Sequence, residues 1–217
     1  MQEFDKIYLV WRKGKGHVRY AVGVISQQQN EYVFQYLPRA RELQTEGFTV
    51  YTEFQDIDRI YNQNILKIFG QRLTNSSRPD VKNLYRFWNV DETKTNDIFY
   101  MLGKTQALLA TDNFELIPEY KTNIPLTFIT EVVGLTHNKV EKGLLQVGDE
   151  LRIEKDSTNV HDSFAIKSFK GNQFIGFIKA IHCQVIAQTD LSNVKITVTA
   201  IDQNGFLKRV FVKVTVV

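Results

Sequence analysis

The sequence predicts an α+β protein with two domains: a small β-sheet with a helical cluster in residues 1–120, and a compact β-barrel with one short helix in residues 121–217. Three observations support this prediction. Segments rich in β-branched and aromatic residues open the chain, apolar residues recur at steps of three and four in its middle, and short strand-like segments return after residue 121. A chain of 217 residues is long enough for two small domains, each with its own core.

The first domain is expected to begin with three strands, at residues 7–11, 18–25 and 32–37. Pro38 then ends the strand pattern and favours the start of a helix. Residues 54–73 are expected to be helical, because their apolar members follow one another at steps of three and four. Two shorter helices are expected, one after Pro79 and one after Thr95, which we assign as its N-cap.

The polar, proline-containing segment at residues 121–125 is the predicted domain boundary. Strands are expected beyond it at residues 126–134, 150–154, 165–169 and 174–178, with a short helix at residues 180–188. The chain is expected to end in a hairpin, since apolar and polar residues alternate along 194–200 and 210–216 and residues 202–205 have turn chemistry. So many short strands in fewer than 100 residues predict a small, curled barrel.

Composition excludes several classes of protein. No apolar run approaches the roughly 20 residues of a membrane span, and the N-terminus has no signal-peptide pattern. The single cysteine, Cys183, excludes an internal disulfide, so a cytoplasmic protein is expected. Residues 1–120 contain 15 Lys or Arg and 15 Asp or Glu, whereas residues 121–217 contain 12 and 9. The basic excess therefore lies in the second domain, where it is compatible with a polyanionic partner.

No catalytic, metal or cofactor site is expected. The Gly103–Thr105 segment resembles the end of a phosphate loop, but it lacks the earlier glycine and follows a helical pattern. Asp80 and Glu92 have the spacing of a nuclease signature, yet they fall at a helix start and in a polar connection rather than at strand ends. The four histidines have no ligand spacing, and Cys183 is expected to be a buried structural residue. An intrinsic nuclease remains a distant alternative.

The second domain contains a series of short motifs in a fixed order. They are Val-Gly-Leu at residues 133–135, Val-Gly-Asp-Glu-Leu at 147–151, an Asn-x-x-Asp-x-x-Ala-Ile segment at 159–166, and Ile-Gly-Phe-Ile at 175–178. This order resembles the HIRAN domain, over roughly residues 124–217. The resemblance implies a compact, OB-like barrel that captures the 3′ end of single-stranded DNA.

The resemblance also implies a set of DNA contacts. Asn159 and Asp162 would form the end pocket, because a carboxylate accepts a hydrogen bond from a 3′-hydroxyl and repels a 3′-phosphate. His161 would hold the aromatic slot, and Phe206 would stack on a base. With the loop after the first strand and the lysines expected to track phosphates, the predicted DNA-binding residues are Thr136, His137, Asn138, Lys155, Asn159, His161, Asp162, Lys167, Lys179 and Phe206.

The sequence departs from the family pattern beside these positions. The usual proline and tyrosine after the asparagine are Val160 and His161 here, and the aromatic pair after Val-Gly-Leu is His137-Asn138. Histidine stacks less strongly than tyrosine, so a weaker affinity or a different ligand is expected. The alternative for Asn159 and Asp162 is that both only cap a turn, as these residue types often do.

Residues 1–120 resemble the N-terminal subdomain of HipA-type kinases. The resemblance rests on residues 23–25 with 32–37, the aromatic helix at 66–73, the RLTNSSRPD stretch at 72–80 and residues 109–112. The kinase core of that family is absent, so the resemblance implies a module that contacts a protein partner. We therefore expect a non-enzymatic, single-stranded-DNA-binding protein of bacterial type. The alternative is a protein-interaction or toxin–antitoxin regulator that does not bind DNA.

Overall fold

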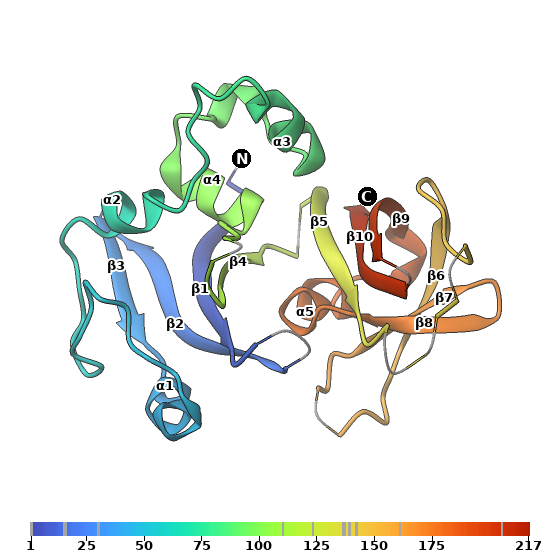
Figure 1. The fold of residues 1–217 in the computed structure, drawn as a ribbon, viewed down its shortest axis with the longest axis horizontal. Coiled ribbons are helices and arrows are strands. Elements are labelled where there is room, and N and C mark those ends of the chain that lie inside the picture. The colour runs from blue at the N-terminus through green and yellow to red at the C-terminus, as the bar shows by residue number, and fades with distance from the viewer. Residues whose placement is uncertain are drawn as a thin grey trace. The chain divides into compact units, whose positions relative to one another are not determined.

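The computed structural model is divided into two compact units, Met1–Glu119 (unit 1) and Tyr120–Val217 (unit 2). It describes residues 2–14, 17–29, 31–109, 111–122, 124–135, 138, 140–141, 143–160, 162–204 and 206–217, with the backbone alone at 203, 204 and 206–208. The fold class is α+β, with a four-stranded sheet and helices in unit 1 and a closed, six-stranded barrel in unit 2 (Figure 1).

Unit 1 is built on a sheet with the strand order β3-β2-β1-β4. Its strands are β1 (Phe4–Arg12), β2 (Arg19–Gln28), β3 (Glu31–Tyr36) and β4 (Phe114–Tyr120). The first three confirm the predicted strands and pair as antiparallel neighbours in sequence order. Strand β4 was not predicted from the sequence. It contains Pro118, which is tolerated there because β4 is an edge strand and needs no complete ladder of hydrogen bonds.

Short helices follow the first three strands. They are α1 (Pro38–Leu43), α2 (Ile65–Gly70), α3 (Val81–Phe87) and α4 (Ile98–Thr105), with 3₁₀ turns η1 (Gln44–Glu46) and η2 (Glu92–Lys94). The N-cap of α4 is Asp97 rather than Thr95: the Asp97 side chain accepts a hydrogen bond from the Tyr100 N–H at 3.0 Å. None of the helices in the described residues is long and apolar enough to cross a membrane.

The predicted helix over residues 54–73 is wrong before residue 65. Asn64 has φ +57°, a left-handed conformation in which an α-helix cannot continue toward its N-terminus. Upstream of it, Asp56 accepts a hydrogen bond from the Asp58 N–H, and Tyr61 forms an isolated bridge with Phe34 of β3. The apolar spacing therefore reflects contacts with the sheet, and the segment is irregular.

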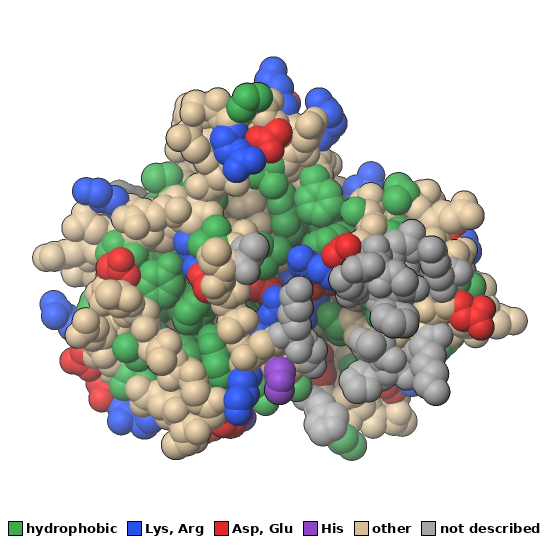
Figure 2. All heavy atoms as spheres, in the orientation of Figure 1, with side chains coloured by type: hydrophobic (Ala, Val, Ile, Leu, Met, Phe, Trp, Pro, Cys, Tyr) green, Lys and Arg blue, Asp and Glu red, His purple; other side chains and the backbone are tan. Residues whose placement is uncertain are grey.

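The core of unit 1 is a cluster of aromatic rings around Phe34, which is fully buried. The ring centroid of Phe34 lies 4.7 Å from that of Phe54 and 5.3 Å from that of Phe69 in α2. On the face shown in Figure 2, the lysines and arginines of unit 1 are mixed with acidic side chains. This agrees with the equal numbers of acidic and basic residues in residues 1–120.

Unit 2 is a closed barrel with the strand order β10-β5-β8-β7-β6-β9, in which every pairing is antiparallel. Its elements are β5 (Leu126–Val133), β6 (Glu150–Lys155), β7 (Ile166–Lys170), β8 (Gln173–Ile178), α5 (Ala180–Ala187), η3 (Leu191–Asn193), β9 (Val194–Asn204) and β10 (Phe206–Val216). All the strands predicted here, the short helix and the terminal hairpin are confirmed. The interior of the barrel is apolar, as the alternation of apolar and polar residues predicted: Val210, Val212, Val214 and Val216 of β10 are all buried.

Candidate nucleic-acid interface

A tightly hydrogen-bonded loop at residues 156–165, the rim loop, joins β6 to β7. The Asp156 N–H donates to the Ala165 carbonyl at 2.8 Å, which closes the base of the loop. Asn159 Oδ1 accepts from the Asp162 N–H at 3.1 Å, and Asp162 Oδ1 accepts from the Phe164 N–H at 2.9 Å. Both predicted end-pocket residues thus cap turns, and they lie side by side on one loop.

The turn-capping hydrogen bond uses only one of the two carboxylate oxygens of Asp162. The side chain is partly exposed, and within the described part of the chain only its Oδ1 accepts a hydrogen bond. The second oxygen, Oδ2, is therefore a carboxylate acceptor to which none of the described loop residues donates. A capping role and a ligand-binding role are compatible at this residue, because different oxygens serve them.

The base of the rim loop is fixed by a second acidic residue, Asp156. Its Oδ1 accepts hydrogen bonds from the Thr158 hydroxyl at 2.8 Å and lies 3.1 Å from Lys167 Nζ. These two contacts, the Thr158 hydroxyl first, hold the pKa of Asp156 below its ordinary value. Asp156 therefore stays ionised at neutral pH and holds the beginning of β7 to the end of β6.

The three predicted phosphate-contacting lysines differ in accessibility. Lys155 is exposed at the end of β6, and the Lys167 side chain is partly exposed beside the rim loop. Lys179 is buried, with 2% of its side chain exposed, and its Nζ lies 3.7 Å from Glu131 Oε2. Because Lys179 is buried beside the Glu131 carboxylate inside the unit, its ammonium group is not on the surface that a DNA strand would contact.

The loop after β5 lies against β8 through Asn138. The Asn138 side-chain amide donates to the Ile175 carbonyl at 3.1 Å, and its N–H donates to the Gly134 carbonyl at 3.2 Å. The Asn138 side chain thus holds the loop after β5 to β8, beside the predicted interface. The remaining predicted contacts, Thr136, His137, His161 and the side chain of Phe206, lie outside the described residues.

Sequence reasoning missed three partly exposed phenylalanines on β7 and β8, which we call the phenylalanine row: Phe169, Phe174 and Phe177. The ring centroids of Phe169 and Phe174 are 5.5 Å apart, and those of Phe174 and Phe177 are 5.3 Å apart. Phe177 pairs with Lys167, two residues from the end of the rim loop. The sequence signal that could have indicated this row is the interleaving of lysines and phenylalanines along residues 167–177.

The residues set aside for catalysis take structural positions. Asp80 forms a two-point ion pair with Arg78 on the surface, which lowers the pKa of Asp80, and Glu92 begins the 3₁₀ turn η2. Cys183 is fully buried in α5, and burial raises the pKa of its thiol to about 12. In the part of the chain that the structure describes, no group of His, Cys, Asp and Glu side chains could hold a metal ion.

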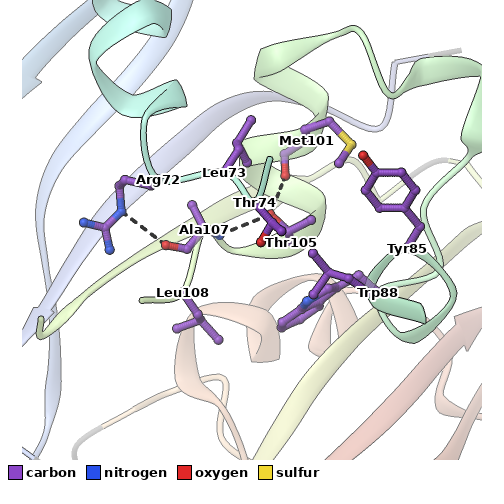
Figure 3. Close-up of a pocket in the computed structure, with 10 residues that line it drawn as sticks. Arg72, Leu73, Thr74, Tyr85, Trp88, Met101, Thr105, Ala107 and Leu108 are labelled. Carbon is purple, nitrogen blue, oxygen red and sulfur yellow. Dashed lines mark hydrogen bonds between the residues drawn. The ribbon is translucent and has the colours of Figure 1, made fainter. Parts of the chain in front are cut away.

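Unit 1 contains a small cavity of about 40 Å³ beside α3 and α4 (Figure 3). Its lining is mixed polar and apolar and consists of Arg72, Leu73, Thr74, Leu84, Tyr85, Trp88, Met101, Thr105, Ala107 and Leu108. The Arg72 guanidinium is occupied by the protein: Nε donates to the Ala107 carbonyl at 3.2 Å, and two other nitrogens contact the Asp112 carboxylate. The charge that lines the cavity is therefore already bound within unit 1.

Two solved structures are similar to part of the chain. No family model and no curated protein matches the chain. The HIRAN domain of human HLTF matches with 20% identity and a TM-score of 0.33, over 42% of this chain and 75% of that one. A Lactobacillus plantarum protein matches with 21% identity and a TM-score of 0.32, over 42% of this chain and 97% of that one.

Proposed function

We propose that unit 2 binds single-stranded DNA at a 3′-hydroxyl end through the rim loop, and that the protein acts by binding alone, without catalysis. The observation that supports this most directly is the carboxylate of Asp162. One of its oxygens is used to hold the loop, the side chain is partly exposed, and no described residue donates to the other oxygen. A preformed acceptor needs little ordering when a ligand arrives, which favours binding.

The chemistry at Asp162 would select for a free end. A terminal 3′-hydroxyl can donate a charge-assisted hydrogen bond to Oδ2, which contributes about 1.5–3 kcal/mol. A 3′-phosphate has no such donor at neutral pH and carries a charge of the same sign as the carboxylate. An internal nucleotide has no free hydroxyl to offer. General affinity for a strand would in this way become affinity for its end.

The lysines around the rim loop would supply the attraction to the strand. Lys155 is exposed. Lys167 is partly exposed, and its ammonium group forms an ion pair with Asp156. Contacts of this kind act on phosphates without regard to sequence and weaken as salt is added. With two such lysines, we expect moderate affinity and a shallow salt dependence.

The test is a titration of the full chain with a 5′-labelled thymidine oligonucleotide that ends in either a 3′-hydroxyl or a 3′-phosphate, followed by fluorescence anisotropy. We expect the hydroxyl end to bind at least about tenfold more tightly. Asp162→Asn keeps an oxygen for the Phe164 N–H but removes the charge, so it should remove most of the preference between the two ends.

Asp91→Asn is the matched control, because Asp91 in unit 1 also accepts the N–H two residues ahead, that of Thr93, at 3.0 Å. This variant should keep the preference of the wild type. Equal affinity of the wild type for both ends would refute capture of the 3′ end, and binding to duplex DNA alone would do the same. No binding to any of these DNAs would favour the alternative of a protein-interaction module without DNA binding.

A further inference from the structure

The phenylalanine row is created by a β-bulge. Phe169 of β7 lies opposite Phe174 of β8, but the residue before Phe169 lies opposite Gly176, so Ile175 is an extra residue in β8. Ile175 and Gly176 are consecutive and both buried, whereas Phe174 and Phe177 on either side of them are partly exposed. The bulge therefore places two phenylalanines of β8 on the same outer surface as Phe169.

A guanidinium extends this surface onto β6. Arg152 lies opposite Phe169 in the pairing of β6 with β7, and its Cζ is 4.2 Å from the centroid of the Phe169 ring. The surface thus offers a line of flat groups across three neighbouring strands, with a cation at one end. Nucleic-acid bases stack on both aromatic rings and guanidinium planes, and they do so whatever their sequence.

The charges around the row can accommodate phosphates. Arg152 is paired with Glu154, and Lys170 Nζ lies 2.5 Å from Asp149. About half of each side chain of the Arg152–Glu154 pair is exposed, and pairs of this kind contribute little to stability. Arg152 can therefore turn from Glu154 toward a phosphate at small cost.

We propose that the phenylalanine row and Arg152 form a stacking surface for the bases of single-stranded DNA that continue from the rim loop. This inference rests on the proposed function and extends it: the barrel holds several nucleotides and not the terminal one alone. The link between the two sites is Phe177, which pairs with Lys167 beside the rim loop. The strand would run from the Asp162 carboxylate across Phe177 and Phe174 toward Phe169.

The experiment compares a thymidine trimer with a nonamer, both with a 5′ label and a 3′-hydroxyl, on the full chain. We expect the nonamer to bind the wild type at least about tenfold more tightly, because only the longer strand reaches the row. Phe174→Leu and Phe169→Leu keep apolar contacts but lose the ring. Each should weaken the nonamer about fivefold or more and leave the trimer unchanged.

The barrel provides a matched control in Phe211, a partly exposed phenylalanine of β10. Its ring also lies under a guanidinium, with Arg209 Cζ 4.5 Å from the centroid, and β10 is separated from β7 by two strands in either direction. Phe211→Leu should therefore leave the affinity for both oligonucleotides unchanged. Far-UV circular dichroism of all three variants checks that each barrel is folded.

The two proposals fail in different ways. If the wild type binds the trimer and nonamer equally well, or if the row variants bind the nonamer as the wild type does, the stacking surface is refuted and end capture stands. The same conclusion follows if Phe211→Leu weakens the nonamer as much as Phe174→Leu does. If the wild type binds neither oligonucleotide, both the proposed function and this inference are overturned.

Discussion

Replacing Glu131 by glutamine is expected to destabilise unit 2 strongly, because Glu131 is the carboxylate beside a buried lysine. Only 5% of the Glu131 side chain and 2% of the Lys179 side chain are exposed. Arg209 contacts the other oxygen, with its Nε 2.8 Å from Oε1. Glutamine has the same shape and keeps an acceptor for Arg209, so the change removes the negative charge that balances Lys179. Loss of one partner from a buried ion pair costs about 3–5 kcal/mol.

The two units can be followed separately in one sample. The only two tryptophans, Trp11 and Trp88, lie in unit 1, so tryptophan fluorescence reports its unfolding. The only cysteine, Cys183, is fully buried in α5 of unit 2, and its raised thiol pKa keeps it unreactive until that unit opens. Labelling of Cys183 by a thiol reagent at pH 8 along a urea titration therefore reports the unfolding of unit 2.

With a urea m-value of about 1–2 kcal/mol/M for a domain of this size, a loss of 3 kcal/mol lowers the labelling midpoint by about 2 M. Glu150→Gln is the control, since Glu150 pairs with Lys195 at 2.7 Å but about 60% of each side chain is exposed. That exposed pair should be worth about 0–1 kcal/mol. A shift below about 0.5 M for Glu131→Gln, or one no larger than that of Glu150→Gln, would refute the reasoning.

Three further predictions follow from the described contacts. Gly176→Ala should destabilise unit 2 by about 1–3 kcal/mol, because the new Cβ would lie 2.2 Å from the Val133 carbonyl oxygen, and Cys183 labelling along a urea titration measures the loss. Gly14→Ala in unit 1, where a new Cβ has its nearest neighbour at 3.7 Å, is the comparison and is followed by tryptophan fluorescence. The pKa of Asp156 is lower in the folded protein than in the unfolded chain, so its ionised carboxylate stabilises the fold above about pH 4, and this stability is lost as the pH falls through the folded-state pKa. Asp156→Asn should therefore flatten the decline in melting temperature between about pH 5 and pH 2. The wild type should neither cleave DNA with Mg²⁺ or Mn²⁺ nor hydrolyse ATP, and a nicking activity that survives further purification would contradict this.

Local sequence patterns predicted secondary structure correctly where a single residue fixes the backbone conformation or where one face of a strand is buried. The alternation along β10 placed its valines in the barrel, and Pro38 marked the start of α1. The same reasoning failed at residues 54–64, where apolar residues also recur at steps of three and four. There the Asp56 side chain accepts a backbone N–H in a turn, and the Tyr61 backbone pairs with Phe34 in a bridge. The spacing of apolar residues cannot reveal that these hydrogen bonds replace those of a helix.

The candidate site was predictable in part for a related reason. Asn159 and Asp162 were singled out by the resemblance to the HIRAN domain, and the stated alternative, that both cap a turn, could be seen in the sequence because such residues act over two or three positions. The position of Lys179 could not be found in this way. Its burial depends on Glu131, which is distant in sequence and reaches it only because β5 and β8 are neighbours in the barrel.

The phenylalanine row shows how one register shift changes the chemistry of a surface. A strict period of two along β8 would place Phe174 and Phe177 on opposite faces, and only the bulge at Ile175 brings them together. Gly176 directly follows the bulge, and any side chain at that position would meet the Val133 backbone of β5. The glycine that made the 175–178 segment resemble a HIRAN motif therefore has a physical role. It lets β5 pass close to β8, and with the neighbouring bulge it turns two aromatic rings outward, toward the proposed path of the strand.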